Sequence, residues 1–204
     1  MVRLQLLTGA RSGELVMMRP CDIDRTGGGI WVYIPADHKT AHHGHQRRIY
    51  IGPRAQKLLA PFLLRRPEAY CFPPAEARAE YLRRINEIRK TPQQQGNAPG
   101  TNRQADPRKK PGDHYTTASY GHAIRQAVKK AYRPAGTSNE EFKTWKAPQH
   151  WHPHQLRHNA ATELRKEFGI EAARIILGHR SAAITEVYAE KDEQRAVLAI
   201  ASIG

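Results

Sequence analysis

The sequence has little cysteine and no long hydrophobic run. Its only cysteines, Cys21 and Cys71, form no CxxC pair and stand beside no group of metal-ligand residues. A disulfide framework is therefore not expected, and a reducing cytosol is the expected compartment. Apolar stretches such as LQLL and KLLAPFLL are far too short to span a bilayer, so no membrane partner is expected.

Acidic residues are also scarce. Asp and Glu number 19 against 33 Lys and Arg, which gives a formal net charge of +14. So large an excess favours a polyanionic partner, above all nucleic acid, although ribosome-like and membrane-surface roles remain open at this point. The length of 204 residues suits a single domain with a core of its own, with room for an insertion.

Local signals predict a mainly helical α+β domain with one small hairpin sheet packed against a helical bundle. The hairpin strands are expected at 30–34 and 47–51, where β-branched and aromatic residues flank a polar tip. Glycine, proline and apolar spacing mark the helices. Helices are predicted over residues 2–7, 13–19, 53–66, 76–90, 115–132, 153–168, 171–177, 182–188 and 191–200.

Two stretches have the composition of irregular chain. The stretch at about 91–113 is rich in Pro, Gly, Gln and charged residues and has almost no apolar ones. It cannot bury enough surface to offset the entropy of ordering, so it is predicted to be a flexible insertion. A second irregular segment is expected at 133–151.

The first candidate for chemistry is a pair of residues behind Pro153. His154 and Arg157 are three apart in a predicted helix and should therefore share a face. A guanidinium can hold two phosphate oxygens, and an imidazole can exchange a proton near neutral pH. HxxR alone is a weak signal in a chain with 11 histidines, and a capped surface helix explains it equally well.

Several strings together resemble the catalytic domain of the tyrosine recombinases, the phage-integrase family. PHQLRHNAAT, LGHRS and ITEVYAE stand in the order and at the separations of that family's C-terminal half, and LTGARSGEL followed by Asp22-Ile-Asp24 resembles its first arginine segment. The resemblance covers nearly the whole chain and implies a single domain over 1–204 with the DNA breaking-rejoining fold. It implies six catalytic residues: Arg11, Lys39, His154, Arg157, His179 and Tyr188.

The resemblance also implies a role for each of these residues. Arg11 and Arg157 would clamp the non-bridging oxygens of the phosphodiester, and His179 would donate a hydrogen bond there. Tyr188 would attack phosphorus, with His154 as base and Lys39 as acid to the departing 5′ oxygen. The product would be a 3′-phosphotyrosyl enzyme. The partners implied are double-stranded DNA and a homo-oligomer, a tetramer, on that DNA, with no cofactor and no metal.

Some assignments have alternatives within the sequence. The hairpin tip offers Arg47 and Arg48 as basic residues besides Lys39. Glu14 and Asp24 are expected to be structural, orienting Arg11 or closing a turn. Histidines cluster at 42–45 and 150–154, but without cysteine such loop clusters rarely close a tetrahedral metal site, so no metal is expected.

The chain departs from the family pattern at its start. Met1 lies ten residues before Arg11, where family members have further helix and a separate DNA-clamping domain. The sequence therefore predicts a site-specific DNA recombinase or integrase that is truncated at the N-terminus. Two alternatives stay open: a catalytically impaired DNA-binding remnant and an activity like that of a type IB topoisomerase.

Overall fold

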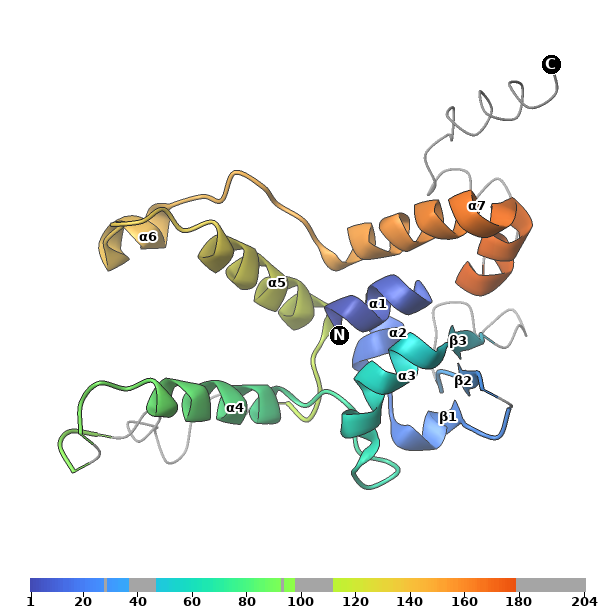
Figure 1. The fold of residues 1–204 in the computed structure, drawn as a ribbon, viewed down its shortest axis with the longest axis horizontal. Helices are drawn as coiled ribbons and strands as arrows, with labels where there is room; N and C mark the ends of the chain where they lie inside the picture. The colour runs from blue at the N-terminus through green and yellow to red at the C-terminus, as the bar shows by residue number, and fades with distance from the viewer. Residues whose placement is uncertain (28, 37–46, 93, 98–111, 179–204) are drawn as a thin grey trace, which may run out of the picture.

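The structure is a computed structural model that describes residues 1–27, 29–36, 47–92, 94–97 and 112–178. A short helix, α1 (Val2–Thr8), lies near the centre and contacts both α3 (Pro53–Leu59) and α7 (Pro153–Leu177), as Figure 1 shows. The first and last described helices thus pack directly together. The other helices are α2 (Ser12–Val16), α4 (Pro74–Glu87), α5 (Thr117–Ala131) and α6 (Asn139–Thr144).

The predicted hairpin is present and belongs to a three-stranded antiparallel sheet. Strands β2 (Trp31–Tyr33) and β3 (Ile49–Ile51) pair with Tyr33 opposite Ile49. A third strand, β1 (Ile23–Asp24), which was not predicted, pairs with the other edge of β2. Both isoleucines of β3 are buried and the tyrosine between them is exposed, which is the alternation expected of a half-buried strand.

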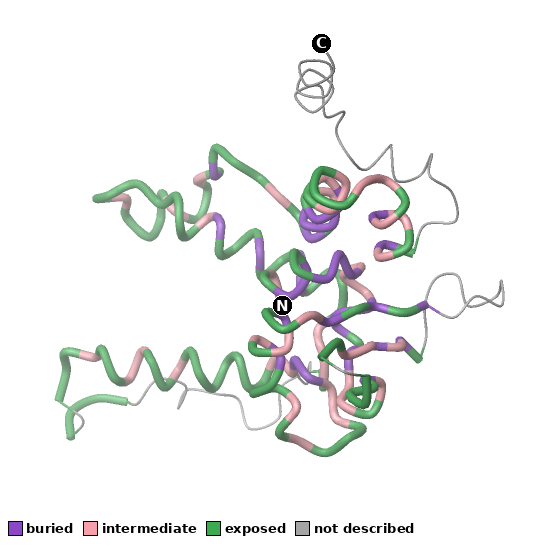
Figure 2. The backbone as a smooth tube through the Cα atoms, turned by 45° about the vertical axis from the view of Figure 1, so that its right-hand side comes forward, coloured by how far each residue is buried: buried purple, intermediate pink, exposed green. Residues whose placement is uncertain are grey.

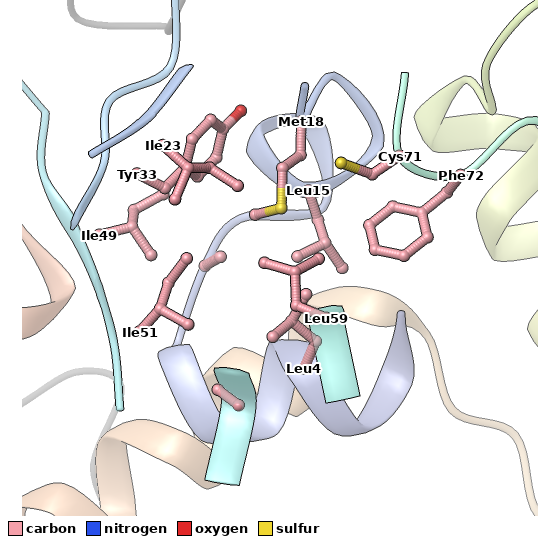
Figure 3. Close-up of a cluster of buried hydrophobic side chains, with 12 residues drawn as sticks. Leu4, Leu15, Met18, Ile23, Tyr33, Ile49, Ile51, Leu59, Cys71 and Phe72 are labelled. Carbon is pink, nitrogen blue, oxygen red and sulfur yellow. The ribbon is translucent and has the colours of Figure 1, made fainter. Parts of the chain in front are cut away.

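The main core lies between the sheet, α1, α2 and α3 (Figure 3). The Tyr33 hydroxyl crosses from β2 to donate a hydrogen bond of 2.6 Å to the main-chain carbonyl of Glu14 in α2. This core therefore fixes the start of α2 against the sheet. Its buried members are Leu4, Ala10, Leu15, Met18, Ile23, Tyr33, Ile49, Ile51, Ala55, Leu59, Cys71 and Phe72.

Two smaller clusters hold the C-terminal helices. One joins α5 and α7 to α2, and the other lies where the two halves of α7 face each other. Figure 2 shows the buried positions concentrated in these central elements, whereas α4 has no buried residue. The first cluster contains Val16, Tyr120, Ile124, Val128, Ala147 and Leu156, and the second contains Ala161, Ala173 and Leu177.

Helix α7 is bent where the sequence predicted a break. Gly169 has a φ of 85° inside the helix, a left-handed value that glycine adopts without steric cost. The chain turns there, and the second half ends at Gly178, which has a φ of 65°. The two predicted helices at 153–168 and 171–177 are thus the two arms of one bent element.

Three local predictions were wrong in detail. Helix α3 ends at Leu59 and tightens into a 3-10 turn, Ala60–Leu63, since Pro61 has no N–H to continue the α-helical ladder. Helix α2 already ends at Val16. The supposedly irregular 133–151 contains α6, which begins with a capping box in which Ser138 and Glu141 satisfy each other's backbone N–H groups.

Much of the predicted insertion lies outside the described residues. Positions 93 and 98–111 are not described, and the described residues of the 91–113 stretch are all exposed. Within the described part of the chain, no helix is both long and apolar enough to cross a membrane.

A buried amide joins three of the central helices. Gln5 of α1 is fully buried and donates to the carbonyls of Ala10 at 3.1 Å and Pro153 at 3.0 Å. Its Oε1 accepts a hydrogen bond of 3.0 Å from the Tyr120 hydroxyl of α5. In the sequence, Gln5 is simply one position within an apolar run. Its three partners fix the turn before Arg11 relative to the start of α7.

We expect Tyr120→Phe to lower the free energy of unfolding by about 1–3 kcal/mol, because Gln5 Oε1 would be left buried without its donor. Chemical denaturation measures this, and the dependence of the unfolding free energy on denaturant concentration should be compared between the variants. The matched control is Tyr132→Phe, which removes an exposed Tyr–Gln hydrogen bond to Gln149 and should change stability by less than about 0.5 kcal/mol. Equal losses in the two variants would contradict the role given to Gln5.

Candidate active site

Arg11 lies at the end of the sharp turn between α1 and α2, directly before α2 begins. Gly9, with a φ of 61°, ends α1, and a Cβ at that position would lie 2.6 Å from the Leu177 side chain. Arg11 then begins α2 with extended backbone angles. Its side chain is 31% exposed, so the guanidinium reaches the surface from a turn that the core holds in place.

Glu14 orients Arg11, as the sequence analysis expected. One carboxylate oxygen accepts the backbone N–H of Arg11 at 2.7 Å, and the other accepts its Nη1 at 2.8 Å. Asp24, the second expected structural acid, closes a turn by accepting the backbone N–H and the hydroxyl of Thr26. Both carboxylates therefore shape the backbone around the candidate site.

A second arginine reaches Glu14 from the hairpin. Arg47 Nε lies 3.1 Å from the carboxylate, and both side chains are only 4% exposed. Burial alone would raise the pKa of Glu14, but the charge of Arg47 and the hydrogen bond and charge of Arg11 together hold it below its usual value. Burial lowers the pKa of Arg47, although the charge and hydrogen bond of Glu14 act in the opposite direction. Arginine titrates so high that Arg47 stays charged near neutral pH.

Arg157 lies beneath the same turn. Its side chain is 1% exposed and donates to the carbonyl of Gly9 at 2.5 Å and to that of Leu177 at 2.6 Å. His154 and Arg157 differ in depth on this helix, because His154 is exposed and Arg157 is buried. Arg157 braces the Arg11 turn against the end of α7.

His154 nevertheless lies within the electrostatic reach of both arginines. Its ring contacts His158 edge-on, with 4.8 Å between ring centroids, and stacks with His152 at 6.4 Å. Partial burial and then the charges of His158, Arg157, His152 and Arg11 lower the pKa of His154. The lowered pKa favours the neutral imidazole, which is the form that can accept a proton.

The other three candidates, Lys39, His179 and Tyr188, lie outside the described residues. The structure thus brings together Arg11, His154 and Arg157 and leaves the rest of the predicted set as a prediction. Among the described residues, no group of three or more His, Cys, Asp or Glu side chains is arranged to hold a metal ion, and the histidines at 150–154 form none.

The family model for the phage integrase family matches residues 1–195, a span that covers nearly the whole chain and includes the positions of all six candidates. The chain belongs to this family. A search of curated proteins finds no match. The tyrosine recombinase fold and the mainly helical α+β architecture expected from the motifs are thereby confirmed.

Solved structures of tyrosine recombinases share the fold of this integrase-family chain. One is the XerH site-specific recombinase in a post-cleavage complex with its palindromic difH substrate, at 17% identity and a TM-score of 0.51. Another is the Tn1549 transposon integrase bound to transposon right-end DNA, at 16% identity and a TM-score of 0.53. The chain is covered to 98% in both cases but spans only 43% and 57% of those chains.

No sequence motif marks two residues of the site, Gln5 and Arg47. Gln5 is an ordinary polar residue in the sequence, and nothing local marks its burial. Arg47 was considered only as an alternative to Lys39 at the hairpin tip, whereas it is buried at the hairpin base against Glu14. The available signal for Arg47 was its place beside the alternating pattern of β3, which predicts an inward-facing residue two positions before Ile49.

We expect His154 to titrate below the usual histidine pKa of about 6.5 in NMR spectra of the folded protein. His158→Gln should move that midpoint upward, because it removes the neighbouring charge that disfavours the imidazolium. Arg78→Gln, which deletes a positive charge on the distant α4 (Figure 1), is the control and should leave the midpoint unchanged. An unshifted midpoint in His158→Gln would rule out the proposed coupling.

Proposed function

We propose that this chain is the catalytic domain of a site-specific DNA recombinase or integrase that cleaves and rejoins DNA through Tyr188. The observation that carries the proposal is the family match over residues 1–195. It is supported by the position of Arg157, which binds the turn before Arg11 although the two arginines are 146 positions apart in the sequence. Both structural relatives were solved in complex with DNA, which supports DNA as the partner.

The proposed reaction is a transesterification at phosphorus. The phenol oxygen of Tyr188 attacks the scissile phosphate, its proton passes to neutral His154, and the bond from phosphorus to the 5′ oxygen breaks. Lys39 supplies the proton that makes the leaving group a free 5′ hydroxyl. The 3′-phosphotyrosyl ester conserves the bond energy, so rejoining is the same step reversed and requires no ATP and no metal.

Positive charge would stabilise the transition state of this reaction. Attack concentrates negative charge on the non-bridging oxygens, and preorganised donors aimed at such charge are each worth about 10²–10³-fold in rate. Arg11 is exposed enough to contact a phosphate directly. Arg157 contributes its charge from beneath the turn. His179 completes the set.

Outside the site, the proposed partner is double-stranded DNA, held by a homo-tetramer in the cytosol. The net charge of +14 supports a broad interaction with the phosphate backbone. A second candidate function is a non-catalytic DNA-binding remnant. The burial of Arg157 favours it, since the guanidinium donates to two main-chain carbonyls rather than facing solvent.

We expect a covalent protein–DNA adduct when the chain meets a suicide substrate, a duplex nicked beside the cleavage site so that the released 5′ end diffuses away. Denaturing gels measure it. Tyr188→Phe should abolish the adduct while DNA binding stays, and EDTA should have no effect. DNA binding by both proteins without an adduct from either would establish the remnant. Relaxation of supercoiled DNA without recombinant products would indicate a topoisomerase.

DNA affinity should depend steeply on salt, because each phosphate contact releases condensed counterions. With six or more contacts, the affinity for duplex DNA should fall about 10³-fold between about 50 and about 200 mM salt. Fluorescence anisotropy with a labelled duplex measures this, and an uncharged osmolyte at equal osmolality is the control. An affinity that holds constant over that range would exclude the backbone-contact account.

A further inference from the structure

We propose that Arg47 is a positioning residue of the site, one that neutralises Glu14 so that Arg11 keeps its charge for the DNA phosphate, and that holds the end of α7 where the chain enters His179. This inference rests on the proposed function for the reaction it serves. Its geometric part stands on contacts of described residues alone.

The Arg47 guanidinium joins three elements. Nε donates to Glu14 Oε1 at 3.1 Å, and Nη1 donates to the carbonyl of Ile176 at 3.1 Å and to that of its neighbour Arg48 at 3.0 Å. One side chain at the base of the hairpin thereby binds α2 on one side and the C-terminal turn of α7 on the other.

The end of α7 is built around this guanidinium. Gly178 has a φ of 65°, and a Cβ there would lie 2.5 Å from Arg47 Nη1 and 3.1 Å from its central carbon. Glycine is thus required twice, by its backbone angle and by the closeness of Arg47. Arg47 therefore constrains Gly178, the last described residue before His179.

Fold stability alone does not account for an arginine at this position. The Nη2 atom of Arg47 is buried and, among the atoms the structure describes, has no hydrogen-bond partner. Such a donor is a cost that folded proteins usually avoid and that functional sites often retain. The Arg19–Asp22 pair shows the ordinary case, in which two hydrogen bonds of 2.8 and 2.9 Å match both carboxylate oxygens of a partly exposed pair.

The charge balance around Glu14 gives Arg47 its effect on the reaction. Glu14 Oε1 accepts from Arg11 Nη1 at 2.8 Å and from Arg47 Nε at 3.1 Å. With Arg47 present, one arginine offsets the carboxylate and the charge of Arg11 is available to a phosphate. Without Arg47, Glu14 would neutralise Arg11 alone, and the site would lose one positive charge where the transition state needs it.

The test is the rate of covalent adduct formation on the suicide substrate at saturating DNA. Arg47→Met should lower this rate by about 10²-fold, the usual effect of losing one oriented charge, while DNA affinity changes by less than about threefold. Arg47→Lys keeps the charge but lacks the guanidinium that bonds both Glu14 and the Ile176 carbonyl. Its rate should lie between those of wild type and Arg47→Met. The variant Glu14→Gln/Arg47→Met, in which both charges are gone, should react faster than Arg47→Met alone.

That rescue separates charge balance from mere structural support. If Arg47 only held the fold, removing Glu14 as well would damage the protein further and slow the double variant. A double variant slower than Arg47→Met, or an Arg47→Met rate within threefold of wild type, would overturn the proposal. Arg19→Met is the control: it breaks another arginine–carboxylate pair, Arg19–Asp22, that does not involve Arg11 or Glu14. Its adduct rate per folded molecule should equal that of wild type.

Hydrogen exchange of residues 173–178 tests the geometric part without any reaction. Exchange there should accelerate in Arg47→Met and stay at the wild-type rate in Arg19→Met, because Arg47 binds the Ile176 carbonyl and Arg19 does not. Unchanged exchange in Arg47→Met would refute the anchoring of α7. If wild type forms no adduct at all, the proposed function fails, and this exchange measurement alone decides whether Arg47 holds the helix end.

Discussion

The candidate site depends on a buried carboxylate that two arginines compensate. Glu14 is 4% exposed, and a lone carboxylate at that depth would be costly unless protonated or paired. Arg11 from the adjoining turn and Arg47 from the hairpin provide the pairing, and each is placed by doing so. The sheet, the turn and α2 therefore have one relative arrangement that satisfies this charge, and Tyr33 secures it by bonding the Glu14 carbonyl.

The same logic extends to the far end of the chain. The last carbonyls of a helix have no partner within it and carry partial negative charge. In α7 two of them accept from guanidinium groups, Ile176 from Arg47 and Leu177 from Arg157. Arg157 also binds Gly9. The turn that carries Arg11 and the helix end that precedes His179 are thus connected by buried cations, which explains how residues so distant in sequence come to share one site.

Local chemistry made much of this architecture predictable. Gly9, Gly169 and Gly178 adopt left-handed angles where helix ends were expected, and the alternating β3 pattern gave its pairing with β2. The burial of Arg157 was not predictable from its spacing to His154, since two residues on one helical face can still differ in depth when the helix packs obliquely. Gln5 gave no local sign at all, because its three partners come from the adjoining turn, α5 and α7. The Ser138–Glu141 capping box was visible in the sequence, but it lay within the 133–151 segment, which was predicted to be irregular.

Two different uses of positive charge follow from this arrangement. The excess of basic residues over the whole chain acts at long range and is screened by salt. It can therefore attract DNA non-specifically, but it does not determine which phosphodiester bond is cleaved. The three arginines around the Gly9–Arg11 turn act at contact distance and are partly or fully shielded from solvent. Because Glu14 cancels one of them, the charge that a phosphate meets is set by pairing inside the protein rather than by the number of arginines nearby. Surface charge and site charge can therefore change independently in this fold.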